Sequence, residues 1–82
     1  MPSKMAPRAS ARDPRAEFGR RVRGRRKKLG WTLEELAEEA GMHWTYVGSV
    51  ERGERNISLI NIVRLARALG IGSEDLLRGL RP

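Results

Sequence analysis

Apolar positions recur along this chain at the spacing of short amphipathic helices, most clearly between residues 32 and 51. Thr32 and Glu35 form a Thr-x-x-Glu capping box, in which each side chain satisfies a backbone donor at the start of a helix. The inward face of this helix is predicted to comprise Leu33, Leu36, Ala37 and Ala40. Gly41 follows, and it can take the left-handed conformation that reverses the chain with little strain. The pattern predicts one helix that ends at Gly41 and another that begins directly after it.

The second helix is predicted to run from about His43 or Trp44 to Arg52, before Gly53. By their spacing, Val47, Val50 and part of Tyr46 face the core. The outward positions are predicted to be His43, Trp44, Thr45, Gly48 and Ser49. Two short helices joined by a glycine-containing turn form a helix-turn-helix, which can hold its second helix free to enter the major groove of DNA. The leading hypothesis is therefore sequence-specific DNA binding.

Two longer helices are predicted on either side of this pair. The first begins near Arg15 and ends at Gly30, with an apolar stripe of Phe18, Val22 and Leu29. The other has Ser58 as its N-cap. Its inner stripe is predicted to comprise Leu59, Ile62, Val63, Ala66 and Leu69. Ile60 and Leu65 widen this apolar surface, so the helix is expected to be the central one.

A short fifth helix is predicted after the N-cap Ser73, with Leu76, Leu77 and Leu80 as its apolar face. No β pattern and no internal repeat is found in the sequence. Five helices with connections of a few residues predict a compact all-α domain.

The composition of the chain argues against several classes of function. The chain has 82 residues, no cysteine and one histidine, which limits it to one domain and excludes disulfides and thiolate metal sites. Because it lacks a convincing nucleophile–base pair, a metal-ligand cluster and a phosphate-cradling glycine loop, we expect no cofactor and no enzyme activity. No apolar run approaches the roughly 18 residues of a membrane span, and the N-terminus lacks the apolar core of a secretory signal. We expect a cytoplasmic protein that does not contact a membrane.

The net charge of +7 is placed unevenly, since residues 1–30 contain eleven Lys or Arg against two acidic residues. Residues 1–14 lack periodic apolar positions and are predicted to form a flexible basic arm, while residues 15–82 form the domain. Lys4, Arg8 and Arg12 of this arm could add diffuse attraction to phosphates. Concentrated positive charge suits a phosphate-facing edge. The alternative is a solvated charge run that aids solubility.

Several segments together carry a family resemblance: Arg26, T-L-E-E-L-A-E-E-A-G at residues 32–41, Val47 and Val50, E-R-G-E-R-N at 51–56, and A-x-A-L-G at 66–70. With them, residues 17–80 resemble the lambda-repressor and Cro-like helix-turn-helix family, also called the xenobiotic response element family of transcriptional regulators. The sequence of residues 43–62 is most similar to that of controller proteins of restriction-modification systems. The resemblance implies a compact five-helix DNA-binding domain.

The resemblance also implies base-contacting positions at His43, Trp44, Thr45 and Ser49, with Tyr46 able to approach a base or the backbone. Thr45 and Ser49 lie four residues apart on one helix face, and each hydroxyl could contact either a base or a phosphate. Trp44 departs from the family, where Arg or Gln often makes two hydrogen bonds to one base, whereas indole has a single donor. It could pack on a thymine methyl or a sugar edge, or form structural or partner-facing surface.

Phosphate contacts are expected from Thr32, Leu33, Arg52, Arg55 and Asn56. Leu33 stands where several relatives have a polar residue, yet its backbone amide at a helix start can still face an anion. For Arg55 and Asn56 the alternative is local stabilisation of their loop. The resemblance further implies a partly buried salt bridge between Arg26 and Glu51.

These inferences predict a homodimeric transcriptional regulator that inserts the helix near residues 43–52 of each subunit into successive major grooves of a pseudo-palindrome, about 34 Å apart. The predicted dimer interface is the last helix, through Leu76, Leu77 and Leu80, with the end of the helix before it. RNA polymerase is a further candidate partner, blocked or recruited according to where the operator lies. A second hypothesis is a protein-interaction module, such as an antitoxin or adaptor, with Trp44 and Tyr46 as its contact patch.

Overall fold

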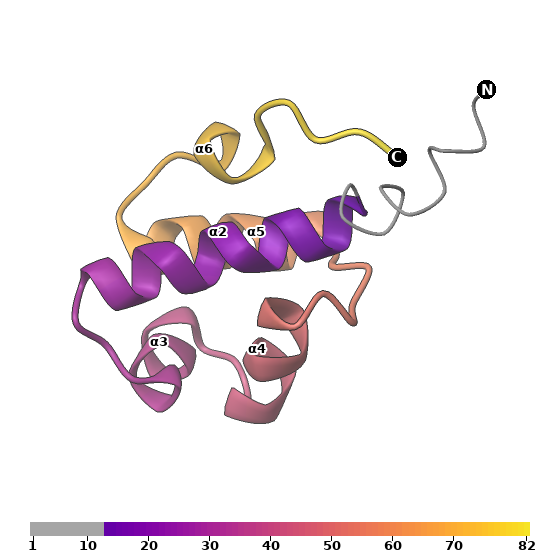
Figure 1. The fold of residues 1–82 in the computed structure, drawn as a ribbon. Helices are drawn as coiled ribbons and strands as arrows, with labels where there is room; N and C mark the ends of the chain where they lie inside the picture. The colour runs from indigo at the N-terminus through magenta and orange to yellow at the C-terminus, as the bar shows by residue number, and fades with distance from the viewer. Residues whose placement is uncertain (1–12) are drawn as a thin grey trace, which may run out of the picture.

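The fold is taken from a computed structural model that describes residues 13–82 and contains five α-helices in that range (Figure 1). They are α2 (Pro14–Lys28), α3 (Leu33–Ala40), α4 (Trp44–Glu51), α5 (Leu59–Leu69) and α6 (Ser73–Leu77). The predicted all-α class is confirmed. The predicted arm, with Lys4, Arg8 and Arg12, lies in residues 1–12, outside the described residues. None of the helices in the described part is long and apolar enough to cross a membrane.

Helices α2 and α5 lie side by side and form the middle of the molecule, with α3 and α4 on one side and α6 on the other (Figure 1). Helix α5 packs against α2, α3 and α6, as expected for the central helix. The turn from α3 into α4 therefore stands at the edge of the domain, and the first turn of α4 is the part of that helix farthest from α2 (Figure 1).

Local side-chain bonds explain most helix starts. The Thr32 hydroxyl accepts from the Glu35 amide at 3.1 Å, and the Glu35 carboxylate accepts from the Thr32 amide at 2.7 Å, which completes the predicted capping box. Ser58 caps α5 through the amide of Asn61. The predicted N-cap of the last helix was wrong by one residue, because Gly72 occupies that position and Ser73 is already helical.

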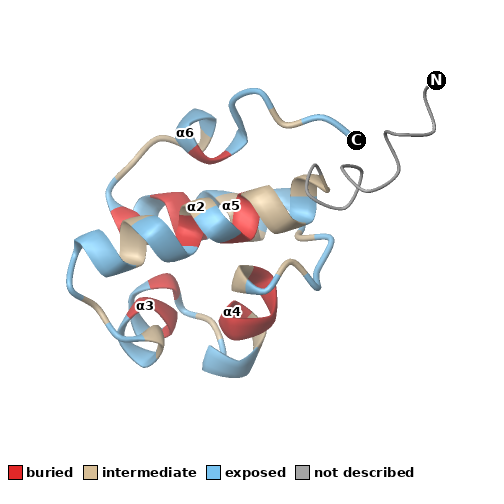
Figure 2. Cartoon of the chain, in the orientation of Figure 1, coloured by how far each residue is buried: buried red, intermediate tan, exposed pale blue. Residues whose placement is uncertain are grey.

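The core lies among the five helices, and their buried faces point toward it (Figure 2). It comprises Phe18, Val22, Leu36, Ala37, Ala40, Val47, Val50, Leu65, Ala66, Leu69 and Leu76. Two predicted stripes were partly wrong. Leu29 is exposed because it follows the last helical residue of α2. In α5, Ala66 and Leu69 are buried as predicted, but Leu59 and Val63 are exposed because the helix turns Leu65 inward.

Two arginines of α2 donate hydrogen bonds to backbone carbonyl groups at the C-terminal ends of neighbouring helices. Arg25 Nε donates to the Leu69 carbonyl at 3.0 Å, and Arg21 Nη1 donates to the Leu76 carbonyl at 3.2 Å. These are positions where a helix leaves carbonyl groups without an intrahelical partner and where cations are favourable. Arg20 and Arg21 also donate to Glu17, and these bonds lower the pKa of the Glu17 carboxyl. Part of the positive charge of α2 therefore holds α5 and α6 in place.

Candidate nucleic-acid interface

The exposed first turn of α4 carries three of the predicted base-contacting residues. His43, Trp44 and Thr45 are all exposed, and 49% of the Trp44 surface is open to solvent. This is a large value for an indole, because tryptophan is highly buried on average. The three side chains follow the Gly41 turn, where a φ of 69° reverses the chain between α3 and α4. The turn thus brings two rings and a hydroxyl to one end of the helix.

His43 is the N-cap of α4, in agreement with the prediction that this helix begins at about His43 or Trp44. Its Nδ1 accepts from the Thr45 amide at 3.3 Å and lies 2.8 Å from the Thr45 hydroxyl. The imidazole and the Trp44 ring are stacked, with centroids 6.3 Å apart and planes inclined by 25°. The end of α4 therefore presents an ordered pair of rings.

The predicted outward orientation of Gly48 and Ser49 was wrong, since both residues are buried. Only 6% of the Ser49 surface is exposed. Its hydroxyl donates to the Tyr46 carbonyl at 2.7 Å and accepts from Arg55 Nε at 3.0 Å. Over Gly48, the Leu33 side chain and the Arg52 guanidinium lie 3.2 and 3.3 Å from the position that a Cβ would occupy. Side chains from outside the helix thus cover this part of α4.

Arg55 is positioned by α4 although it lies in the loop that follows the helix. Besides its bond to Ser49, its guanidinium carbon lies 5.3 Å from the centroid of the Tyr46 ring, a cation–π distance. Tyr46 is partly buried, and its hydroxyl accepts from Asn61 of α5 at 3.3 Å. The sequence reasoning missed Asn61 because only the tertiary fold brings α5 to this ring. Together these contacts hold one cation at the edge of the exposed end of α4.

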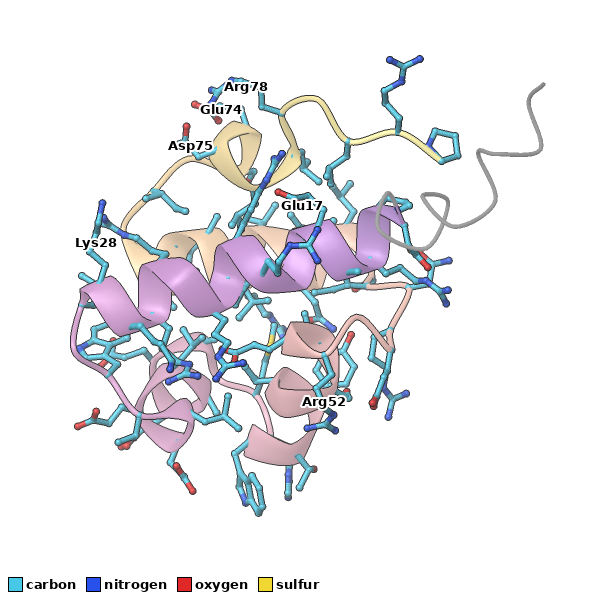
Figure 3. All side chains as sticks on the ribbon, in the orientation of Figure 1. Glu17, Lys28, Arg52, Glu74, Asp75 and Arg78 are labelled. Atoms are coloured by element: carbon cyan, nitrogen blue, oxygen red, sulfur yellow. The ribbon has the colours of Figure 1, made fainter. Side chains whose placement is uncertain are left out.

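The other predicted phosphate contacts lie at the surface or near it. Arg52 and Asn56 are exposed, and Arg52 Nε donates to Glu54 at 3.0 Å. Figure 3 places Arg52 on the α4 side of the molecule and the acidic residues Glu74 and Asp75 on α6, across α2. On α3, the Thr32 hydroxyl is exposed at the helix start, whereas Leu33 is partly buried against the core.

A buried ion pair joins α2 to the end of α4. Arg26 Nε and Nη2 donate to the two oxygens of Glu51 at 2.7 and 2.9 Å, and Nη1 donates to the Trp31 carbonyl at 3.0 Å. Only 12% of the Arg26 side chain and 7% of the Glu51 side chain are exposed. The bond to Glu51 raises the pKa of Arg26 above its ordinary value, so the guanidinium remains charged.

The predicted dimer interface needs a correction. Leu76 is fully buried within the single chain, because the short α6 turns it onto α2 and α5. Leu80 is partly buried against the same core, and Leu77 is exposed. The large exposed hydrophobic residues of α5 are instead Leu59, Ile60 and Val63, with exposures of 70%, 61% and 40%. Within residues 13–82, no group of three potential metal ligands comes together.

A family model described as helix-turn-helix matches residues 22–76, more than half of the chain and the whole of α3 and α4. The chain belongs to the lambda-repressor/Cro-like helix-turn-helix family. As a member of this family it is a DNA-binding transcription regulator, with α3 and α4 as its helix-turn-helix.

Relatives and solved structures of this family cover most of the chain. Control protein C.BamHI of Bacillus amyloliquefaciens is 46% identical over 61 residues, covering 73% of this chain and 75% of its own length. The restriction-modification controller protein C.AhdI from Aeromonas hydrophila has a crystal structure with a TM-score of 0.74 and 47% identity, covering 76% and 94% of the two chains. SinR, a master regulator for biofilm formation solved in complex with DNA, has a TM-score of 0.70 and 34% identity, covering 73% and 97%.

Proposed function

We propose that two copies of this chain bind a pseudo-palindromic duplex, with α4 of each copy in the major groove and successive half-sites about 34 Å apart. The observation that carries this proposal is the exposed first turn of α4, where His43, Trp44 and Thr45 stand clear of the domain. Arg52 and Arg55 lie just beyond the same helix, where they could bind phosphates and set the register on the groove. The control proteins among the relatives favour regulation of a restriction-modification system as the physiological role.

Arg55→Ala is expected to weaken duplex binding about 10-fold to 100-fold and to reduce the slope of log affinity against log salt by about one. The reason is the loss of a guanidinium that Ser49 and Tyr46 hold beside α4. Fluorescence anisotropy with a selected duplex at several salt concentrations measures both effects.

Arg78→Ala is the matched control, because it removes the same charge from an exposed position at the end of α6, across α2 from α4 (Figure 3). We expect it to change affinity less than threefold, as for a distant charge screened by salt. Equal effects of the two substitutions would argue against a phosphate contact at Arg55. Unchanged duplex binding by Arg55→Ala, together with loss of a protein partner, would favour the adaptor hypothesis and would count against the DNA-facing surface.

The second element of the proposal is a homodimer built on the exposed apolar face of α5. At 100° per residue, Leu59, Ile60 and Val63 fall within one arc of about 100° beside the stripe that enters the core. A contiguous exposed apolar face marks an interaction site, and a twofold dimer would bury it against its own copy. This face replaces Leu76 as the proposed contact.

Ile60→Lys is expected to raise the dimer dissociation constant about 30-fold or more, because each half of a twofold contact would receive an unpaired charge. Sedimentation over a concentration series measures the shift. Leu29→Lys serves as the control, since it places the same charge at another exposed leucine, at the end of α2. A dimer that tolerates Ile60→Lys as well as Leu29→Lys would mean that the interface lies elsewhere.

A further inference from the structure

The N-cap contact of His43 determines which of its ring nitrogens faces outward as a donor. A backbone N–H can only donate, so Nδ1, which lies 3.3 Å from the Thr45 amide, must accept. A neutral imidazole with an accepting Nδ1 carries its proton on Nε2. The capping geometry that starts α4 therefore leaves His43 with a hydrogen-bond donor on the exposed side of the ring.

Trp44 adds a second donor and a broad apolar surface. Indole carries one N–H, which donates only, and no acceptor. Its ring is stacked on His43 and half exposed, so the two rings form one continuous exposed surface. Neither side chain offers an acceptor, because Nδ1 of His43 is occupied by the cap.

Thr45 adds no further hydrogen-bond donor to this surface. Since Nδ1 of His43 accepts and has no proton, the Thr45 hydroxyl at 2.8 Å donates to it and shares the single lone pair of Nδ1 with the Thr45 amide. The hydroxyl proton is thereby used within the protein, and only the lone pairs and the methyl group of Thr45 remain for a ligand. Ser49, the other hydroxyl of the predicted set, is buried by Arg55 and Tyr46. The donors of this surface therefore come from His43 and Trp44.

We propose that the His43–Trp44 pair sets the base preference of the half-site: a keto base, guanine or thymine, faces His43, and a thymine next to it packs its methyl group on Trp44. This inference rests on the proposed insertion of α4 into the major groove. Guanine offers O6 and N7 there, and thymine offers O4 and its methyl group, all suited to a donor or to an apolar face. Cytosine offers only an exocyclic amine donor at the corresponding edge, and adenine places its amine donor beside the acceptor N7, so in both bases the His43 donor would meet or lie next to another donor.

The pair of rings also explains why the base preference of relatives with arginine or glutamine at the position of Trp44 cannot be applied to this chain. Those side chains make two hydrogen bonds to one base, whereas a tryptophan makes one at most. Selectivity at this position must therefore come from the single indole N–H, from shape and from the thymine methyl group. A single buried methyl group contributes about 0.8 kcal/mol, which corresponds to about fourfold in affinity.

The test begins with selection from random duplexes by the full chain, followed by footprinting. The expected result is a two-half motif with a keto base adjacent to a thymine under the footprint of α4. His43→Asn keeps a good N-cap residue but is too short to carry a donor to the same place. We expect it to lower the preference for a keto base at that position about 10-fold.

Replacing the thymine that faces Trp44 by uracil in one half-site of the selected duplex tests Trp44 directly, because the exchange removes only the methyl group. Wild-type affinity is expected to fall about fourfold, and the affinity of Trp44→Ala is expected to be unaffected by the same exchange. Thermal melting of each variant confirms that it is folded. Arg78→Ala, at the end of α6, is the control variant and should respond to uracil as the wild type does.

The outcomes separate this inference from the proposed function. Duplex binding with adenine or cytosine at the two positions, or with preferences that neither variant alters, would overturn the role of the ring pair and leave DNA binding by α4 intact. Failure to enrich any sequence, with no duplex bound by wild type or variants, would overturn both.

Discussion

Glu51→Ala is expected to lower the free energy of unfolding by about 3–5 kcal/mol, because it leaves the guanidinium of Arg26 buried without its partner. Both side chains are nearly enclosed, and Arg26 also bonds to the Trp31 carbonyl, so it cannot turn to solvent without breaking a second contact. Single domains are stable by about 5–15 kcal/mol, so the variant is expected to be partly unfolded at 37 °C. Urea denaturation followed by circular dichroism measures the change.

Glu54→Ala is the matched control for this prediction. Glu54 pairs with Arg52 at 3.0 Å, but more than half of each side chain is exposed. Exposed pairs contribute about 0–1 kcal/mol. A second comparison is the double variant Arg26→Met, Glu51→Leu, which should recover much of the lost stability because no lone charge remains buried. Similar losses for Glu51→Ala and Glu54→Ala would show that burial does not set the strength of the Arg26 pair.

Gly19→Ala is expected to destabilise the domain by about 1–3 kcal/mol or more, although alanine is the better helix former. A Cβ at Gly19 would stand inside contact distance of the carbonyl oxygens of Val50 and Glu51, both backbone atoms of α4. Helix α2 would have to move away from α4 to accept it. Thermal unfolding measures the loss of stability, and DNA affinity of the folded fraction reports on the displacement of α4.

Gly24→Ala provides the control within the same helix. No atom of a neighbouring element lies within 4 Å of a Cβ at Gly24, so only helix propensity should act. We expect this variant to be more stable by about 0.5–1 kcal/mol. The two substitutions are therefore predicted to change stability in opposite directions. Stabilisation by Gly19→Ala would mean that α2 and α4 are not held as closely as described.

Both predictions concern the contact between α2 and α4, which holds the base of the proposed recognition helix. Gly19 allows the close approach, and the ion pair between Arg26 and Glu51 fixes the end of α4. The opposite end of α4 is left exposed, with His43 and Trp44 on its first turn. The arrangement is rigid where the helix joins the domain and open where we propose that it meets DNA.

The sequence by itself determined the helices and, apart from the start of α6, their approximate ends, because these depend on interactions within a few residues. Thr32 and Glu35 lie three apart and close a capping box, and Ser58 caps α5 over the same distance. The family followed from several such local segments together, and the family model confirms it. The spacing of apolar residues also placed His43, Trp44 and Thr45 on the outside, as the structure has them.

Only the tertiary structure decided whether a residue at the margin of a predicted face is covered. Ser49 was predicted to face outward, but Arg55 folds back onto it, and Leu76 was predicted to face a partner but completes the core of its own chain. In α5, apolar residues lie on most of the circumference, so periodicity could not separate Leu65 from Leu59. The burial of a side chain depends on which neighbouring helix or loop packs against it. That packing is set by contacts throughout the chain and not by the spacing of residues within one helix.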